Sequence, residues 1–284
     1  MDIDARTQFC GVIGNPVGHS LSPAIHNAAF RKLRLNFVYL AWQVEAIGEA
    51  IKGLRALGNF RGASVTIPHK VAAISFLDHV EQTAQRIGAI NTIVAEKGEL
   101  TGYNTDATGA LRALKEGGVE LTGRRIVVLG SGGAARAIAF ALAGESGAEQ
   151  LTLLGIDDGE RTSLAQEIRS QAALTVQDFH LDETTLRRVL PEAHVLIHCT
   201  PVGMSPKADA TSVPAALLHA GLSVMDIVYN PLETRLLKDA KHVGCKTIPG
   251  LEMFLNQAVA QFELWTNQPA PVDVMRTVLE SHFR

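Results

Sequence analysis

Apolar runs of strand length alternate with segments of helical periodicity along the first part of the chain. The run at 10–14 stops at Asn15-Pro16, and Ser22-Pro23 is a start signal that predicts a helix through Lys32. The pattern then predicts strands over 36–43, 63–67 and 91–96, and helices over 44–57, 71–77, 80–87 and 107–117. This alternation is typical of an α/β unit.

A second series of the same kind begins near residue 121. It predicts strands over 125–129, 151–154, 195–198, 223–228 and 245–248, and helices over 134–143, 161–173, 251–264 and 271–282. Strands joined through helices need crossover connections, so we expect parallel β-α-β units. The fold class is therefore α/β, and we place a domain boundary within 107–117.

Composition and charge narrow the choice of partners. The chain has 284 residues, of which 46% are hydrophobic, and this is enough for two ordinary globular cores. A formal charge of -3 and a pI near 6.4 provide no basic field. We therefore expect neither nucleic acid nor an anionic membrane as a partner, and a small metabolite remains possible.

Cysteine usage and the N-terminal segment favour the cytoplasm. Cys10, Cys199 and Cys245 are odd in number and show neither metal-ligand nor CxxC spacing, and the ten histidines show no metal-ligand spacing either. The first residues include two acids and lack the apolar core of a secretory signal. The most apolar stretch, 126–144, contains Arg136 and four glycines, so it predicts a strand, a turn and a helix rather than a membrane span.

A glycine-rich turn follows the predicted strand 125–129. It consists of Gly130, Ser131, Gly132, Gly133 and Ala134. Glycines there permit a tight turn and allow backbone N–H groups to approach a pyrophosphate at the positive end of the following helix. Because a strand precedes the turn and a helix follows it, we interpret it as a dinucleotide site; a structural turn is the alternative.

Two carboxylates end the next predicted strand. Asp157 and Asp158 stand about 25 residues after Gly132, near the place where such sites carry an acid that accepts from the ribose 2′-hydroxyl of NAD. A carboxylate repels the 2′-phosphate of NADP, and the nearest base is Arg161. The residues also suit helix N-caps, and both roles can coexist.

Polar clusters interrupt the apolar pattern of the first half. They are Gly18–Pro23, Ser64–Lys70, Gly88–Thr92 and Gly102–Asp106. Their hydroxyls and amides suit the oxygens of a small polyhydroxylated acid, while Lys70 and Asp106 can move a proton. Each also has a structural explanation: Ser22 and Asp106 can cap helices, and Lys70 can be a solvated surface lysine.

Short motifs in register along nearly the whole chain resemble the shikimate dehydrogenase family. They are Gly14-Asn15-Pro16, Ser20-Leu21-Ser22-Pro23, Val65-Thr66-Ile67-Pro68-His69-Lys70, Gly88-Ala89-Ile90-Asn91-Thr92, Gly102-Tyr103-Asn104-Thr105-Asp106, Gly130–Ala135, Thr200–Met204, Asp226–Thr234 and Gly250–Met253 leading to Gln257. Several motifs in order are far more specific than any one of them.

The resemblance implies NAD(P)-linked, reversible reduction of 3-dehydroshikimate to shikimate without a metal. It implies that Ser20 and Ser22 hold the substrate carboxylate, with Tyr229 near that end. The residues that contact ring hydroxyls and the reacting oxygen would be Thr66, Lys70, Asn91, Asp106 and Gln257, and the cofactor residues would include Thr200, Val228 and Gly250. Lys70 would be the general acid and base, with Asp106 as its partner.

The resemblance also implies the domain organisation. We expect a substrate domain at 1–108, joined by C-terminal helices at about 252–284, and a Rossmann-type, doubly wound dinucleotide domain at 109–251. We expect a monomer or a homodimer.

Departures from the family pattern affect the cofactor and the substrate. Ser64 stands where many members have Asn, so its substrate contact is less secure. Gly155-Ile156-Asp157 replaces the Asn-Arg-Ser/Thr motif of NADP-preferring members, so we expect NAD over NADP. NAD-using relatives often oxidise quinate, and Ser22, where such relatives tend to have Thr, favours shikimate. The alternatives are a quinate/shikimate dehydrogenase and a non-catalytic dinucleotide-binding sensor, against which Lys70 and Asp106 argue.

Overall fold

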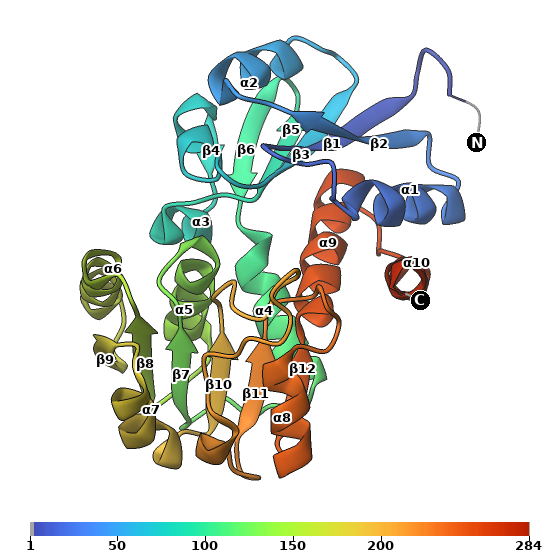
Figure 1. Ribbon diagram of the computed structural model, residues 1–284. Coiled ribbons are helices and arrows are strands. Elements are labelled where there is room, and N and C mark those ends of the chain that lie inside the picture. Colours follow the sequence, from blue (N-terminus) through green and yellow to red (C-terminus); the bar gives the residue numbers. More distant parts are fainter. Residues whose placement is uncertain (1–2, 284) are drawn as a thin grey trace. The chain divides into compact units, whose positions relative to one another are not determined.

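The computed structural model describes residues 3–283, and the chain divides into two compact α/β units. The first runs to Thr105 and takes up the chain again from Gln257; the second runs from Asp106 to Asn256. Each unit contains one six-stranded sheet (Figure 1). The predicted α/β class is confirmed.

The first sheet is mixed. Its strands are β1 (Gln8–Gly14), β2 (Phe37–Gln43), β3 (Phe60–Val65), β4 (His79–Val80), β5 (Thr92–Glu96) and β6 (Glu99–Tyr103), in the order β2-β1-β3-β5-β6-β4. β1 is parallel to β2 and β3, whereas β5 is antiparallel to both β3 and β6. The pattern did not predict β6, which forms a tight antiparallel hairpin with β5 through Lys97 and Gly98, both at positive φ.

Helices cover this sheet. They are α1 (Ser22–Lys32), α2 (Ile47–Arg55), the short 3-10 helix η1 (Ala72–Phe76), α3 (Gln82–Ile87), the later part of α9 (Gly250–Thr266) and α10 (Val272–His282). α10 packs against α1 (Figure 1). The predicted helix at 71–77 is only a 3-10 turn. The one predicted at 80–87 was wrong at its start, because Val80 pairs in β4 and Glu81 caps α3.

A group of buried aromatic side chains joins α9 to the sheet of this unit. Trp265 is fully buried, and its indole N–H donates to the carbonyl of Ile93 at 2.9 Å. Phe30 lies 5.4 Å from Phe262 between ring centroids, and Tyr39 lies 5.7 Å from Trp265. The return of the chain from Gln257 onward therefore completes the core of the first unit.

The second sheet is fully parallel. Its strands are β7 (Arg125–Leu129), β8 (Gln150–Gly155), β9 (Thr175–His180), β10 (Val195–His198), β11 (Ser223–Asp226) and β12 (Lys246–Pro249), in the order β12-β11-β10-β7-β8-β9. The direction of winding reverses between β7 and β10, which is the doubly wound arrangement of a Rossmann-type domain. β9 is a strand that the pattern did not predict, because Gln177 and Asp178 interrupt its apolar positions.

The helical elements of this unit connect those strands. They are α4 (Thr105–Glu116), α5 (Gly133–Glu145), α6 (Asp158–Gln171), α7 (Glu183–Val189), η2 (Leu190–Glu192), η3 (Ala215–Leu217), α8 (Arg235–Val243) and the first turns of α9. The apolar core lies between sheet and helices and includes Leu129, Leu154, Leu196 and Leu236. Within residues 3–283, no helix is long and apolar enough to cross a membrane.

Candidate active site

A buried cluster of polar side chains lies at the ends of β3 and β5 in the first unit. Asn91 is 3% exposed, and its Oδ1 accepts from the Thr105 backbone N–H at 2.7 Å and from the Thr92 hydroxyl at 2.8 Å. Its Nδ2 donates to Thr105 Oγ1 at 3.0 Å. Ser64, in β3, also belongs to this cluster, and its side chain is 7% exposed. Buried polar groups this well bonded hold fixed orientations.

Ser20 and Ser22 lie at the start of α1. Ser22 is the first residue of the helix and is buried, and its N–H donates to Ser20 Oγ at 3.3 Å. The N-cap position belongs to Leu21, and no side chain caps this helix end. The capping interpretation of Ser22 was therefore wrong, because the helix starts one residue earlier than a Ser22 cap requires.

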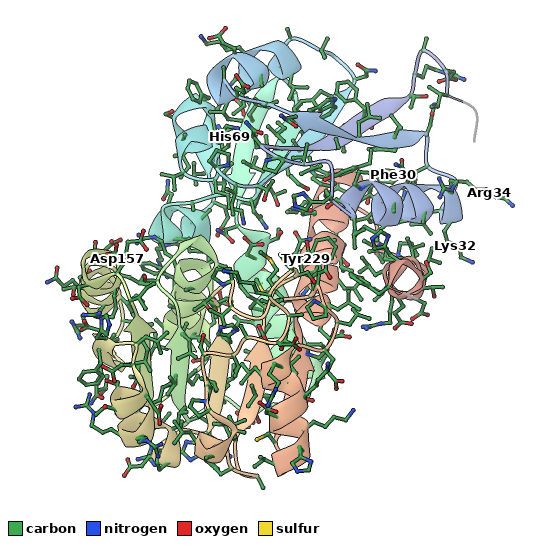
Figure 2. All side chains as sticks on the ribbon, in the orientation of Figure 1. Phe30, Lys32, Arg34, His69, Asp157 and Tyr229 are labelled. Carbon is green, nitrogen blue, oxygen red and sulfur yellow. The ribbon has the colours of Figure 1, made fainter. Side chains whose placement is uncertain are left out.

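The backbone around Thr66 and Lys70 is held at both ends. Thr66 N–H donates to Ile13 O at 2.9 Å, and Lys70 O accepts from Ile90 N–H at 2.9 Å. Between them, buried His69 places Nε2 2.6 Å from Val44 O, which fits the prediction of a satisfied histidine (Figure 2). Lys70 is partly buried rather than fully solvated.

The remaining predicted substrate residues occupy helices and a loop. Asp106 is the second residue of α4 and follows Thr105, whose bonds to Asn91 fix the start of that helix. Gln257 lies in α9 and is 9% exposed. In the second unit Tyr229 follows β11 and packs at a tilt against Phe254 with ring centroids 4.9 Å apart, and burial raises the pKa of its phenol (Figure 2).

The glycine-rich turn joins β7 to α5 in the second unit. Gly130 has φ +109°, and a Cβ there would lie 3.1 Å from Cys199 O, so only glycine fits without strain. Gly132 is the N-cap of α5, Gly133 and Ala134 are in its first turn, and neither a side-chain cap nor an acid occupies this end. The uncapped N–H groups suit the pyrophosphate of a dinucleotide.

Acidic side chains surround the end of β8, next to this turn. Asp157 is the N-cap of α6 and accepts from Glu160 N–H at 2.8 Å, which confirms its capping role (Figure 2). Glu160 in turn accepts from the Ser131 hydroxyl at 3.3 Å. Hydrogen bonds from Arg161, and then from His180, hold the pKa of Asp158 below its ordinary value.

Arg161, the nearest base, is directed away from solvent. It is 8% exposed and forms an ion pair with Asp158. Its guanidinium also contacts Asp178 at 3.3 Å and donates to Gly155 O at 3.2 Å. These partners neutralise its charge within the fold.

A buried hydrogen-bonded network lies at the ends of β10 and β11 and reaches the predicted cofactor residues Thr200 and Val228. Asp226 Oδ1 lies 2.9 Å from His198 Nδ1 and accepts from Val228 N–H at 3.0 Å, while Oδ2 accepts from Thr234 Oγ1 at 2.6 Å. The other ring nitrogen of His198 bonds Thr200. The network holds Thr200 and Val228 in place. Gly250 begins α9, where a Cβ would lie 2.5 Å from the Ile227 backbone.

Comparison with known proteins identifies the family. Residues 12–93 match the shikimate dehydrogenase substrate binding domain, and residues 250–280 match the shikimate 5'-dehydrogenase C-terminal domain. The shikimate dehydrogenase (NADP(+)) of Moorella thermoacetica is 45% identical over 98% of this chain and 95% of its own length. The chain belongs to the shikimate dehydrogenase family. Members are NAD(P)-dependent oxidoreductases that act on a CH–OH group, and this chain is one of them.

Two solved structures align over nearly the whole chain. The shikimate 5-dehydrogenase of Listeria monocytogenes, determined with shikimate and NAD, is 38% identical with a TM-score of 0.93 and covers 98% of both chains. The quinate dehydrogenase of Corynebacterium glutamicum, determined with NAD, is 31% identical with a TM-score of 0.91 and covers 97% of this chain and 99% of its own. Both structures were determined with NAD.

Two side chains that lie beside the predicted substrate cluster of this shikimate dehydrogenase family member, Tyr39 and Gln261, were not identified from the sequence. Tyr39 Oη lies 2.6 Å from Ser64 Oγ, and Ser64 Oγ donates to Gln261 Oε1 at 2.8 Å. Tyr39 fits the alternation of a strand and so looks like a core residue. Gln261 is 1% exposed in an apolar helix, and an amide on a buried face is a signal that could have indicated it.

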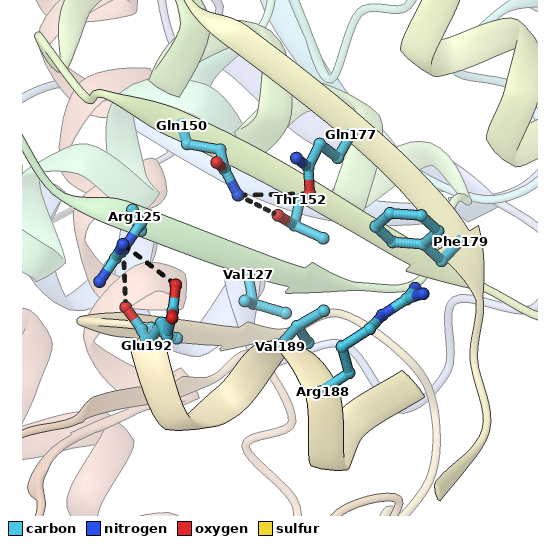
Figure 3. A pocket seen from close by; sticks show the side chains of 10 residues that line it. Arg125, Val127, Gln150, Thr152, Gln177, Phe179, Arg188, Val189 and Glu192 are labelled. Carbon is cyan, nitrogen blue, oxygen red and sulfur yellow. Dashed lines mark hydrogen bonds and ion pairs between the residues drawn. The ribbon is translucent and has the colours of Figure 1, made fainter. Parts of the chain in front are cut away.

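A hollow of about 300 Å³ lies on the sheet face of the second unit (Figure 3). Its wall includes the first residues of β7 and β8, Arg125 and Gln150, together with Phe179 and Arg188. Arg125 pairs with Glu192 at 3.1 Å, and the Arg188 guanidinium lies 4.2 Å from the Phe179 ring centroid. Because it adjoins the amino ends of these strands, it is separate from the glycine-rich turn at their carboxyl ends. Among residues 3–283, no group of three potential metal ligands comes together.

Proposed function

We propose that this chain catalyses the reversible NAD(P)-dependent reduction of the 3-keto group of 3-dehydroshikimate to shikimate. The observation that carries the proposal is the buried, hydrogen-bonded cluster of Ser64, Asn91 and Thr105. Ser64 and Asn91 lie within residues 12–93, which are similar to the family's substrate binding domain. Hydroxyl and amide groups with fixed orientations suit a ring that carries several hydroxyls. The name of the Moorella relative supports the same substrate pair.

The start of α1 suits the substrate carboxylate. No acidic residue lies in its first turn and no side chain caps it, so Ser20, Ser22 and the positive helix end are compatible with an anion. Tyr229 would lie toward the same end of the substrate. Ring hydroxyls and the reacting oxygen would bond the other predicted residues, which are Ser64, Thr66, Lys70, Asn91, Asp106 and Gln257.

In this proposal Lys70 moves the proton. When bound, NAD(P) would supply the hydride in one direction and accept it in the other. As charge develops on the substrate oxygen, the Lys70 ammonium stabilises it and donates a proton; in the reverse direction Lys70 accepts that proton. Asp106 orients the ammonium and accepts from a neighbouring substrate hydroxyl.

We infer that NAD is preferred over NADP. The turn Gly130–Ala134 would hold the pyrophosphate, and Thr200, Val228 and Gly250 would line the nicotinamide end. Asp157 and Asp158 place carboxylates where the ribose 2′-hydroxyl could donate a hydrogen bond to one of them. Arg161 is already paired with Asp158 and Asp178. The site therefore has an acceptor for a hydroxyl and no unpaired Arg161 for a phosphate.

Quinate is the second candidate substrate, because a quinate dehydrogenase is among the similar structures. Quinate has an additional hydroxyl on the carbon that bears the carboxylate, so space near Ser20 and Ser22 decides its acceptance. A pocket that only tolerates a hydroxyl discriminates weakly, and Ser22 favours shikimate slightly.

Initial rates with shikimate and quinate, each with NAD and NADP, test these assignments. The rate is measured as the increase in absorbance of the reduced cofactor. We expect fast oxidation of shikimate with NAD. Preference for NADP would contradict the interpretation of Asp157 and Asp158, and dominant quinate oxidation would favour the second candidate. NADH binding without turnover of any pair would favour a non-catalytic sensor.

A further inference from the structure

Ser64 Oγ takes part in a chain of hydrogen bonds that crosses three elements of the first unit. Tyr39 comes from β2, Ser64 from β3 and Gln261 from α9. Ser64 Oγ is 2.6 Å from Tyr39 Oη and 2.8 Å from Gln261 Oε1. The exposed fractions of these side chains are 1% for Tyr39, 7% for Ser64 and 1% for Gln261. The bonds are therefore shielded from exchange with bulk water.

The orientation of the Gln261 amide follows from its other partners. One amide atom lies 3.2 Å from the Asn91 backbone oxygen and 3.0 Å from Thr92 Oγ1. A backbone carbonyl can only accept, so this atom must be the donor Nε2. The opposite atom is then Oε1, which can only accept, and it faces Ser64.

The direction of the remaining protons follows in turn. A serine hydroxyl has one proton, and Ser64 donates it to Gln261. Tyr39 must therefore donate its phenolic proton to Ser64 across the 2.6 Å contact. Ser64 Oγ then has no proton for any other partner, and its remaining capacity is as an acceptor.

Tyr39 and the adjacent His26 do not change charge at neutral pH. Burial raises the pKa of Tyr39 far above its ordinary value, so the phenol stays a donor. His26 stacks on Tyr39 with ring centroids 4.6 Å apart, and burial lowers the pKa of its imidazole to about 3. The direction of the hydrogen bonds is thus constant across the physiological range.

We propose that Tyr39 and Gln261 are positioning residues that make Ser64 a pure hydrogen-bond acceptor toward the substrate. This inference rests on the proposed function, in which Ser64 contacts the substrate ring. A pure acceptor binds a ring hydroxyl and repels a carbonyl oxygen, which has no proton to give. The keto group is thereby excluded from Ser64 and directed to donors such as the Lys70 ammonium. The series of hydrogen bonds from Tyr39 through Ser64 to Gln261 thereby selects the orientation in which the substrate ring binds.

Gln261→Met tests the proposal, because methionine has a similar length but cannot accept the Ser64 proton. The Ser64 proton then has no fixed acceptor and Ser64 is no longer held as an acceptor, so its hydrogen bond to the ring hydroxyl should weaken. The probes are shikimate and its 4-deoxy and 5-deoxy analogues, each measured as kcat/KM for oxidation with NAD. We expect the unaltered chain to disfavour one analogue by about tenfold or more, as expected when one hydrogen bond is lost. We expect Gln261→Met to reduce that ratio to about threefold or less.

Tyr39→Phe is a second variant that keeps the ring and its packing. Ser64 loses the donor that orients it, so we expect KM for shikimate to rise about fivefold while kcat changes less than about twofold. Phe262→Leu is the control, since it lies beside Gln261 in the same buried helix and makes no polar contact with Ser64. It should lower stability and leave the shikimate to deoxyshikimate ratio unchanged.

The outcomes separate this inference from the proposed function. If the unaltered chain oxidises shikimate but both variants keep its analogue ratio and its KM, the positioning role is wrong and the proposed function stands. If Phe262→Leu changes the ratio as much as Gln261→Met, the effect is one of packing and the proposal fails. If the unaltered chain turns over no shikimate, both proposals fail.

Discussion

Asp157 combines a structural and a proposed functional role in a single side chain. Its carboxylate caps α6, and its charge contributes to the acidic end of β8. The two roles can be separated, because serine is also a good N-cap residue but has no charge.

Asp157→Ser should therefore raise the preference for NADP without unfolding α6. We expect the ratio of kcat/KM for NADP over NAD to increase about tenfold, which corresponds to 1.4 kcal/mol less repulsion of the 2′-phosphate. The measurement is initial rate with each cofactor. Asp182→Ser is the matched control, since Asp182 caps α7 in the same manner. An unchanged ratio in Asp157→Ser would contradict the ribose contact.

Lys70→Ala tests the proposed proton donor. We expect kcat for shikimate oxidation to fall about 10²- to 10⁴-fold with a much smaller change in KM, because the lost interaction belongs mainly to the transition state. Lys52→Ala, which removes an exposed lysine paired with Glu49 on α2, should change neither constant. An unchanged kcat in Lys70→Ala would contradict the assignment of Lys70 as the proton donor.

The neutral, buried His26 predicts a pH dependence of stability. Its pKa is about 3 in the folded chain, well below the ordinary value, so the unfolded chain binds the proton more readily between pH 3 and 6.5. The free energy of unfolding should therefore decrease as pH falls through this window, by up to about 1.4 kcal/mol per pH unit from this group. Urea unfolding of the unaltered chain and of His26→Gln at several pH values measures the difference. Parallel pH profiles of the two proteins would show that His26 does not contribute.

At the scale of elements, the loops after β10 and β11 depend on one buried carboxylate. Asp226 is fully buried, and its oxygens bond His198, Val228 and Thr234. The strand alignment places His198 opposite Asp226, so the register of the sheet brings the pair together. The loops that carry Thr200 and Val228 are held by this side chain and not by regular structure of their own.

Asp226→Ala should destabilise the chain and weaken cofactor binding together. Leaving several buried donors unpaired costs about 3 kcal/mol in the free energy of unfolding. Urea unfolding and fluorescence titration with NADH are the two measurements. Asp239→Ala, which breaks only the surface pair with Arg235 on α8, should leave both values nearly unchanged. Normal NADH affinity in Asp226→Ala would argue against a link between the network and the cofactor loops.

At the scale of the whole molecule, the first unit is assembled from the two ends of the chain. Residues up to Thr105 need the segment from Gln257 onward, because Trp265, Phe262 and Gln261 fill and bond the space beside its sheet. The hydrogen bond from Trp265 to Ile93 joins positions 172 residues apart, and the whole second unit lies between them in the sequence.

Trp265→Phe should reduce the stability of this assembly. The Ile93 carbonyl then loses its buried donor, which costs about 1–3 kcal/mol, while most of the aromatic packing remains. Urea unfolding followed by far-ultraviolet circular dichroism measures the change. Trp42→Phe provides the comparison, since Trp42 is partly exposed and packs edge-on against Phe9. Equal losses in the two variants would mean that the Ile93 hydrogen bond adds nothing.

The sequence by itself determined the elements whose pattern is strong and local. The strands expected at 125–129 and 195–198 coincide with β7 and β10, and the glycine-rich turn stands between β7 and α5 as its residues require. The motifs also determined the family. Apolar periodicity and special backbone conformations are properties of neighbouring residues, so they can be recognised without the fold.

Tertiary structure alone decided the features that depend on distant residues. β6 and β9 pair despite their polar positions because neighbouring strands supply their hydrogen bonds. The Arg161 side chain is neutralised by Asp178, a residue of the unpredicted β9. Gln261 reaches Ser64 from 197 positions away, and no local pattern contains that contact. A hydrogen bond depends on where two side chains meet in space, and only the packed fold specifies that meeting.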